Sequence, residues 1–293
     1  MKVLIVGGVA GGASAAARLR RLDEQAEIIV FERTGFVSYA NCGLPYYIGG
    51  VIEQESALTL QSPKGFWDRF HITVKTSHEV TAIHPEEHTV EVHNLETGEH
   101  FVETYDKLIL SPGAYPIRPE LPGIDSNKLF SLRTVEDTLR IHSYVQEHKP
   151  TSAVVVGGGY IGIEAAENLR KLGLEVTLLQ RPKQLMNNLD FDMATFVHMK
   201  MRDSGINLRL GANVTGFQEV DGRIVTNVAE GSPITADMVL LAIGVMPESH
   251  LAKEAGLQLG IKGAIAVNDR METSAPDVYA VGDAVQVKHQ VTG

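Results

Sequence analysis

The sequence has 293 residues, which at roughly 150 residues per domain predicts two domains. Its 26 Lys and Arg against 36 Asp and Glu give a net charge of −10. This balance argues against nucleic acids and anionic membranes as partners, because attraction to phosphate needs a basic surface. The single cysteine excludes an internal disulfide and a zinc site built on several thiolates. It favours a reducing, cytoplasmic compartment, and no apolar run approaches the ~20 residues of a membrane span.

The chain begins with a pattern typical of a dinucleotide-binding unit. A buried strand is expected at Val3–Val6, then a glycine turn and a helix over Ala13–Leu22. A second strand, Glu27–Phe31, ends at Glu32, which follows Gly12 by 20 residues. In such units the glycine backbone approaches a pyrophosphate at the helix N-terminus, and the acid accepts hydrogen bonds from a ribose.

The first glycine turn departs from the usual motif at one position. Gly7 and Gly12 occupy the first and third glycine places, but Val9 occupies the second. The strand, helix and acid around the turn support the assignment, and an ordinary βα turn is the alternative.

A strand-rich stretch and a linker follow. Strands are expected at 72–74, 79–83, 89–93, 100–103 and 108–110. Asn94 and Gly98 mark a hairpin turn between two of them. The histidines at 84, 88, 93 and 100 lack the spacing of a metal site and are expected to face solvent. Prolines after residue 111 mark a linker and the first domain boundary.

The second unit has the full glycine motif. Within Ala153–Leu169, a strand is expected before the glycines and a helix after them. The glycines of the motif are Gly157, Gly159 and Gly162. Further helices are expected at 134–147 and 191–204, and further strands at 213–218, 223–227, 239–248, where the strand runs into a Gly/Pro turn, and 278–284.

The strand after the second motif does not end in an acid. Glu175–Leu179 is followed by Gln180 and Arg181, so a strong ribose acceptor and a repulsion of the 2′-phosphate of NADPH are both missing. Arg181 could attract that phosphate, or it could simply point into solvent. We therefore expect the site to accept NADPH, with NADH not excluded.

The only cysteine, Cys42, lies in the segment Phe36–Gly50, about ten residues after Glu32. A segment that leaves the end of this strand runs along the cofactor crevice, where a thiol could lie beside a reactive ring. A helix start nearby would favour the thiolate. The alternative is a small buried side chain, which is the common environment of a free cysteine.

Together these motifs resemble the pyridine nucleotide–disulfide oxidoreductases that have a single redox cysteine. The similarity rests on the G-x-V-A-G-G turn, Y-A-N-C-x-L-P-Y-Y-I-G-G, S-P-G, G-G-G-Y-I-G-x-E and Y-A-V-G-D. The segment around Cys42 is closest to the coenzyme A-disulfide and persulfide reductases, and the NADH oxidases and peroxidases are the alternative. The resemblance implies an α/β fold with two Rossmann-like three-layer domains, the second inserted in the first: 1–115 and 245–293 for FAD, and 116–244 for NAD(P)H.

The resemblance also implies site residues. The cofactor-binding residues would be Gly7, Val9, Ala10, Gly12, Glu32, Arg33, Asn41, Ala114, Gly157, Gly159, Tyr160, Ile161, Gly162, Glu164, Gln180, Arg181, Gly244, Gly282 and Asp283. Tyr160 would cover the flavin until nicotinamide displaces it, and Glu164 would lie near the nicotinamide. Coenzyme A would contact Arg18, Arg21, Ser38 and Asn41, with the two arginines on one helix face. No metal is expected.

One thiol restricts the chemistry. Cys42 would be oxidised either as a mixed disulfide with a small thiol or as a sulfenic acid. We favour the first, with hydride passing from NAD(P)H to FAD and electrons then reducing a Cys42–coenzyme A disulfide. An NADH oxidase or peroxidase and a non-catalytic flavin redox sensor are the alternatives.

The resemblance finally implies that the chain is incomplete, because a C-terminal dimerisation domain would follow in the family. We expect the full-length protein to be a homodimer, and this chain to bind FAD, turn over poorly and not form that dimer.

Overall fold

A computed structural model describes residues 1–289 and 291, in two compact units that are each built from separate segments. The first unit contains Met1–Ala40, Thr59–Tyr115 and Met246–Gly293; the second contains Asn41–Leu58 and Pro116–Val245. The chain therefore passes between the units four times. Residues 290 and 292–293, the end of the first predicted domain, lie outside the described residues.

This division differs from the predicted domains at residues 41–58, which the sequence assigned to the first domain. They group with the second unit because helix α2 (Leu44–Ile48) packs against α4 (Val135–His148) and α5 (Tyr160–Lys171). The assignment of FAD to one unit and NAD(P)H to the other stays a prediction.

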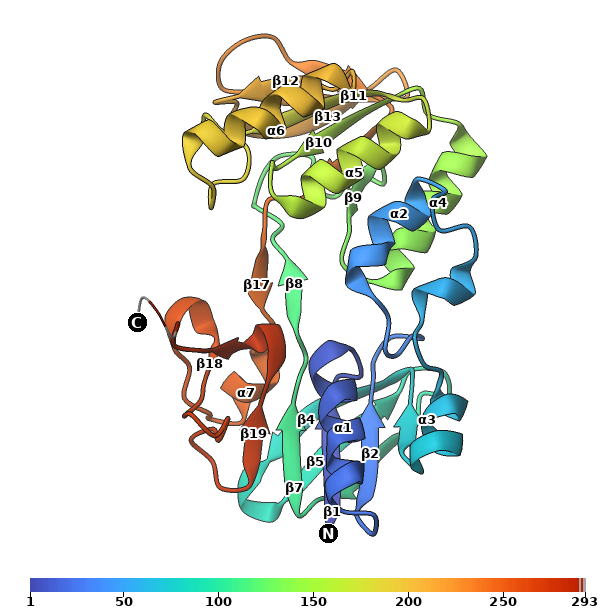
Figure 1. The fold of residues 1–293 in the computed structure, drawn as a ribbon, viewed down its shortest axis with the longest axis vertical. Coiled ribbons are helices and arrows are strands. Elements are labelled where there is room, and N and C mark those ends of the chain that lie inside the picture. The colour runs from blue at the N-terminus through green and yellow to red at the C-terminus, as the bar shows by residue number, and fades with distance from the viewer. Residues whose placement is uncertain (290, 292–293) are drawn as a thin grey trace. The chain divides into compact units, whose positions relative to one another are not determined.

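The first unit is built on a five-stranded parallel sheet in the order β19-β7-β1-β2-β3 (Figure 1). Its strands are β1 (Lys2–Val6), β2 (Glu27–Phe31), β3 (Thr73–Lys75), β7 (Lys107–Leu110) and β19 (Val278–Ala280). Both faces are buried. Val3 and Ile5 pack with α1 (Ala10–Leu22) on one face, and Leu4 and Val6 belong to a second core on the other.

A three-stranded antiparallel sheet supplies the second of these cores. It consists of β4 (His78–His84), β5 (Thr89–Asn94) and β6 (His100–Thr104), in that order. The predicted hairpin turn is confirmed, since Gly98 has φ +76° and its N–H donates to the Asn94 carbonyl at 2.8 Å. The unit is completed by α3 (Pro63–Phe70), β8 (Ala114–Pro116), β17 (Val245–Pro247), α7 (His250–Glu254), β18 (Ile265–Ala266) and β20 (Val285–Gln286). The last residue of β8 and the first residue of β17 belong to the second unit.

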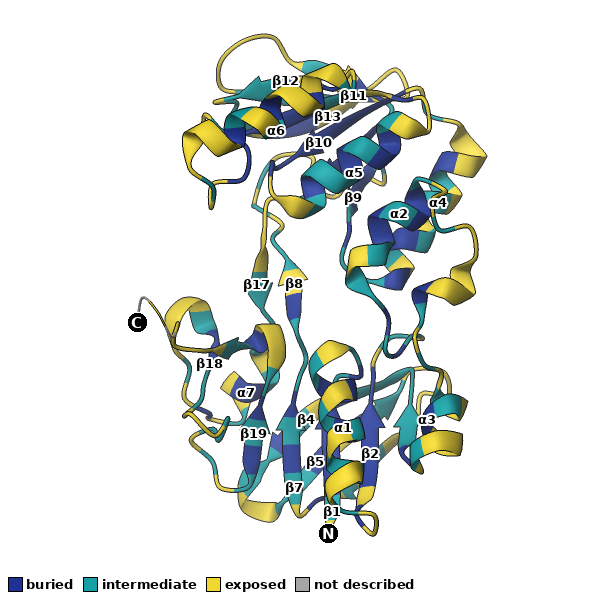
Figure 2. Cartoon of the chain, viewed as in Figure 1, coloured by how far each residue is buried: buried dark blue, intermediate teal, exposed yellow. Residues whose placement is uncertain are grey.

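The second unit repeats the plan. Its parallel sheet has the order β12-β11-β10-β16-β9, with β9 (Leu129–Ser131), β10 (Ser152–Val156), β11 (Glu175–Gln180), β12 (Asn207–Leu210) and β16 (Met238–Leu241). Helix α5 packs against β10 and β11, and α6 (Phe191–Asp203) against β12. A small antiparallel sheet shares a core with β10 and consists of β13 (Val214–Val220), β14 (Arg223–Val228) and β15 (Ile234–Ala236). Figure 2 shows β10 buried along its length. The predicted α/β class is confirmed.

Asp237 lies between β15 and β16 and links the start of β10 to β14. Its Oδ2 accepts hydrogen bonds from the backbone N–H and hydroxyl of Thr151 and of Ser152 at 2.8–2.9 Å, and Arg223 Nε lies 3.0 Å from Oδ1. Burial by itself raises the pKa of Asp237, but the hydrogen bonds from Thr151 and Ser152 outweigh it and lower the pKa to about 2. Asp237 therefore stabilises the start of β10 as a carboxylate.

This network predicts a loss of stability in acid. Because the folded pKa of Asp237 lies below its unfolded value, its contribution of about 2 kcal/mol is complete above pH ~4 and is lost between pH ~4 and ~2. We expect Asp237→Asn to lower the urea midpoint at pH 7 and to make the further fall of this midpoint in acid smaller. The matched control is Asp221→Asn, at an exposed turn residue with φ +50° that asparagine tolerates. If the urea midpoint falls equally in acid for Asp237→Asn and the unmodified protein, the Asp237 carboxylate does not stabilise the fold as described.

Candidate nucleotide and thiol sites

The first glycine turn has the close approach that its motif predicts. Gly7 has φ +95° and donates its N–H to the Phe31 carbonyl at 2.8 Å. A Cβ on Gly12 would lie 1.9 Å from the Gly7 oxygen, so the helix can start against the turn only with glycine there. Val9, in the second glycine place, is the N-cap residue of α1, and Ala10 begins the helix.

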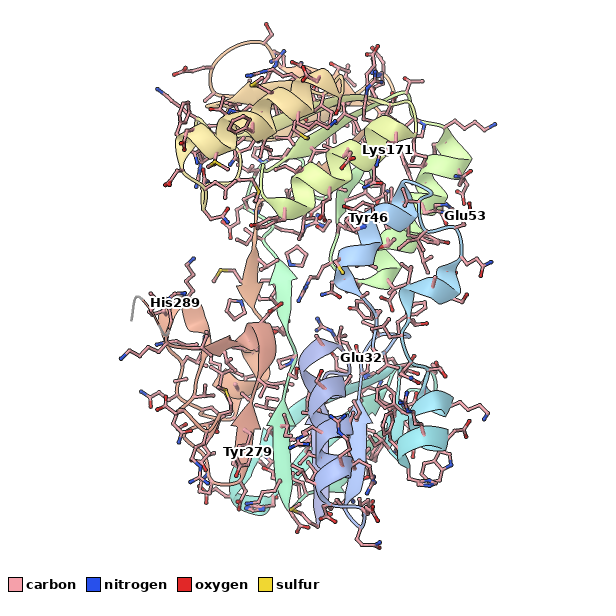
Figure 3. The ribbon with its side chains drawn as sticks, in the orientation of Figure 1. Glu32, Tyr46, Glu53, Lys171, Tyr279 and His289 are labelled. Carbon is pink, nitrogen blue, oxygen red and sulfur yellow. The ribbon has the colours of Figure 1, made fainter. Side chains whose placement is uncertain are left out.

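Glu32 fixes this turn from the end of β2 (Figure 3). Its carboxylate is buried, and it accepts a hydrogen bond from Gly8 N–H at 2.8 Å and two from Thr34, through N and Oγ1, at 2.9 Å. Gly7 and Glu32 line a cavity of about 800 Å³ that lies within the first unit. Arg33 lines the cavity as well, and its Nη2 lies 3.7 Å from Oε2 of Glu248. This volume suits a small-molecule or cofactor ligand.

Two predicted residues from the far end of the sequence lie beside the first turn. Gly282, with φ +82°, follows β19, and its Cα would lie 3.6 Å from a Cβ on Gly11. Asp283 is the next residue and is exposed. Ala114 is buried in β8. The parallel sheet brings the ends of β1 and β19 to the same edge, which is why residues so distant in sequence meet there.

The second glycine turn has nearly the same geometry. Gly157 has φ +115° and donates to the Leu179 carbonyl at 2.8 Å, and a Cβ on Gly162 would lie 1.9 Å from the Gly157 oxygen. Gly158 N–H donates to Gln180 Oε1 at 2.9 Å, as Gly8 donates to the acid of the first unit. The buried amide of Gln180 therefore keeps the structural role of the acid without its charge, which the sequence analysis did not foresee.

Both helices that follow the glycine turns begin in a way that suits an anion. Among the described residues, neither α1 nor α5 has a side-chain cap at its N-terminus or an acidic residue in its first turn. The first N–H groups of each helix, and the positive end of its dipole, therefore face a place where a pyrophosphate would bind. The residues fit two dinucleotide cofactors.

The other residues predicted for the second site lie around α5. Tyr160 is its first residue and is 63% exposed, and its hydroxyl accepts a hydrogen bond from Asn188 at 3.1 Å. Ile161 and Glu164 are half-buried; burial raises the pKa of Glu164, and Glu167 raises it further. Of the other residues predicted for this site, Gly159, Arg181 and Gly244 are exposed.

Cys42 is exposed, so the alternative of a buried structural cysteine is wrong. It lies in a short 3-10 helix, Asn41–Gly43, directly before α2. Asn41 precedes Cys42, and among the described residues its buried side-chain oxygen has no hydrogen-bond partner, which leaves an acceptor that a ligand could satisfy.

The predicted coenzyme A contacts belong to both units. Arg18, Arg21 and Ser38 lie in the first unit, where both arginines are exposed on α1, and Asn41 lies in the second. Arg20, between the two arginines, instead donates to the carbonyls of Phe70 and His71. The grouping of these residues around coenzyme A, and of Cys42 beside a flavin, stays a prediction.

Comparison with known proteins decides the family. The family model described as "Pyridine nucleotide-disulphide oxidoreductase" matches residues 1–292. The chain belongs to this family.

Several relatives in the family are similar along nearly the whole chain. A coenzyme A disulfide reductase from Staphylococcus aureus is 40% identical over 282 residues, covering 96% of this chain and 63% of the relative. The crystal structure of reduced Bacillus anthracis CoADR-RHD is 50% identical with a TM-score of 0.96, covering 99% of this chain and 52% of the other. A NAD-dependent persulfide reductase from A. fulgidus is 34% identical with a TM-score of 0.93, covering 97% and 53%. The chain thus spans less than two thirds of each of these relatives.

No helix in the part of the chain that the structure describes combines the length and apolar character needed to cross a membrane. Within residues 1–289 and 291, no three His, Cys, Asp or Glu side chains are grouped in a way that could bind a metal ion.

Proposed function

We propose that the protein is an FAD-dependent NAD(P)H oxidoreductase that reduces coenzyme A disulfide or persulfide through Cys42. The observation that carries the proposal is an exposed lone thiol in a chain with two dinucleotide-type turns. Within the described part of the chain, the side-chain oxygen of the preceding Asn41 is buried without a partner, and neither turn has a side-chain cap. The similarity to a coenzyme A disulfide reductase and a persulfide reductase supports the substrate class.

The two glycine turns have separate tasks in this proposal. The first unit would bind FAD, with Glu32 at a ribose and the α1 N-terminus at the pyrophosphate, and the second would bind NAD(P)H through α5. FAD supplies a two-electron acceptor that can pass electrons from a nicotinamide to a disulfide. The chain itself binds and orients the two nucleotides and supplies the thiol.

The thiol chemistry balances with one cysteine. The Cys42 thiolate attacks one sulfur of coenzyme A disulfide, the S–S bond breaks, and one coenzyme A leaves as its thiolate. The new Cys42–coenzyme A disulfide takes two electrons, which originate from NAD(P)H, and releases the second coenzyme A. In sum, one NAD(P)H, one proton and one disulfide give NAD(P)⁺ and two thiols. A persulfide substrate would give coenzyme A and sulfide by the same balance.

The test compares three acceptors under anaerobic conditions. FAD-loaded protein is mixed with NADPH or NADH, and coenzyme A disulfide, coenzyme A persulfide and hydrogen peroxide are supplied in turn. Consumption that requires a coenzyme A substrate supports the proposal. Peroxide-dependent consumption without coenzyme A would indicate the peroxidase alternative, and consumption that begins only when oxygen is admitted would indicate the oxidase alternative. FAD binding with no turnover on any acceptor would indicate a redox sensor.

Gln180 provides a test of coenzyme choice. Gln180→Glu should keep the hydrogen bond from Gly158 N–H, because Glu32 accepts the same bond from Gly8 in the first unit, while it loses the amide donor to the Gln184 carbonyl. The new charge would repel a 2′-phosphate, so we expect the preference for NADPH over NADH to fall about ten-fold, or about 1.4 kcal/mol. The measurement is the ratio of kcat/KM for the two coenzymes. Gln180→Leu, which removes the acceptor without adding charge, should lower stability instead. An unchanged ratio in Gln180→Glu would show that this side chain does not face the ribose.

A further inference from the structure

The chain that follows β11 returns to the second glycine turn in the same way as its counterpart in the first unit. Ser38 N–H donates to the Gly8 carbonyl at 2.8 Å, and Met186 N–H donates to the Gly158 carbonyl at 2.9 Å. Both residues have left-handed backbones, with φ +51° and +49°. In each unit, a segment after the second strand is thus fixed against the turn at equivalent points.

The two segments differ in what anchors them. In the first unit Thr34 bonds both Glu32 and the Phe36 carbonyl, and Leu60 N–H donates to the Ser38 carbonyl at 2.8 Å. In the second unit the anchor comes from another element: His198 of α6 accepts the Leu185 N–H at Nε2 at 3.0 Å. His198 is 4% exposed and Leu185 is fully buried, so water cannot replace this bond.

The anchored segment, residues 182–190, contacts three parts of the site. Leu185 packs against Gly158, where its Cδ2 lies 2.3 Å from the position of an added Cβ. Gln180 Nε2 donates to the Gln184 carbonyl at 3.2 Å, and Asn188 donates to the Tyr160 hydroxyl at 3.1 Å. The segment therefore sets the orientation of the side chain at the predicted ribose position and of the first residue of α5.

We propose that His198 is a positioning residue of the NAD(P)H site, acting through the segment 182–190. The proposal rests on the proposed function for the identity of the ligand. The imidazole must be neutral, with its proton on Nδ1, because Nε2 accepts a hydrogen bond. Burial favours this form by lowering the pKa of His198, and Arg202 on the same helix lowers it further. Without the acceptor, a buried Leu185 N–H is left unpaired, which favours a displaced segment.

The experiment measures binding rather than turnover. FAD-loaded protein is titrated with NADP⁺ and with NAD⁺ by calorimetry. His198→Leu should weaken binding of the preferred nucleotide about ten-fold. Without the bond to Leu185, only a minor fraction of the molecules would keep segment 182–190 in the arrangement that binds the nucleotide. His198→Gln, which can accept the Leu185 N–H, should restore most of the affinity. In turnover, KM for the nucleotide should rise more than kcat falls.

Two further variants keep the test decisive. Met201→Ala removes a buried side chain from the same helix and should lower the unfolding midpoint while leaving nucleotide affinity unchanged. If His198→Leu does not fold, Gln184→Ala replaces it, because Gln184 Nε2 stabilises the same segment through the Leu189 carbonyl at 2.9 Å. Wild-type affinity in a folded His198→Leu or Gln184→Ala overturns the proposal. Failure of the unmodified protein to bind either nucleotide would instead contradict the proposed function.

Discussion

Replacing Cys42 with serine is expected to abolish the reduction of coenzyme A disulfide by NADPH, with a loss of at least about 10³-fold in kcat. A serine hydroxyl cannot form the mixed disulfide through which electrons reach the substrate, and the sequence has no second cysteine to replace it. Cys42 is exposed and serine is close to it in size, so the fold and the FAD content should not change. The measurement is anaerobic NADPH consumption with coenzyme A disulfide.

The control for Cys42→Ser uses the same protein with another acceptor. Ferricyanide takes electrons from a bound flavin without a thiol, so NADPH consumption with ferricyanide should persist in the variant. Loss of both activities would indicate damage to cofactor binding rather than to the thiol step. Full turnover of the coenzyme A substrate in Cys42→Ser would refute the scheme.

The second large effect concerns the glycine turns. Gly162→Ala is expected to destabilise the second unit by at least about 3 kcal/mol and to remove NADP⁺ binding, because its Cβ would lie 1.9 Å from the Gly157 oxygen. That oxygen belongs to the backbone of the turn and cannot move independently of it. FAD binding should persist, since the turn of Gly7 and Gly12 is separate. The readouts are thermal unfolding and calorimetric titration.

Gly159→Val is the matched control for this steric argument. Apart from its own local backbone, no described residue lies within 4 Å of a Cβ built on Gly159, and its φ of −85° suits any residue. Valine already occupies the equivalent place in the first unit, at Val9. We therefore expect Gly159→Val to leave the unfolding midpoint unchanged. A drop as large as that of Gly162→Ala would show that added volume anywhere in the turn is harmful, and that the close approach is not the cause.

The sequence predicts the elements that have a strong local pattern. Both strand–turn–helix–strand units and the hairpin at Asn94 and Gly98 occur as expected, because buried strands and glycine turns are specified by neighbouring residues. Three short helices were missed: α2, α3 and α7. The start of α3 did have a readable signal, since Ser62 precedes Pro63 and its hydroxyl accepts the Gly65 N–H at 3.1 Å. Helix α2 has only five residues and lies between two glycines, so it is too short to show the hydrophobic periodicity of a helix.

Contacts between distant segments could not be predicted. The sequence assigned 41–58 to the first domain by proximity along the chain, whereas the contacts of α2 with α4 and α5 place the segment in the second unit. One of these contacts needs Gly49, where a Cβ would lie 2.2 Å from the side-chain oxygen of Asn168. The role of His198 was missed for the same reason, because no local motif connects it to Leu185.

The four passages of the chain between the units have a consequence for synthesis on the ribosome. All segments of the second unit have been translated once residue 245 is made, so this unit can fold while the first is unfinished. The sheet of the first unit must wait for its edge strand β19, at Val278–Ala280. Until then, the β7 edge is unpaired and open to association with other nascent chains. The C-terminal part of the chain thus completes a sheet that its first residues began.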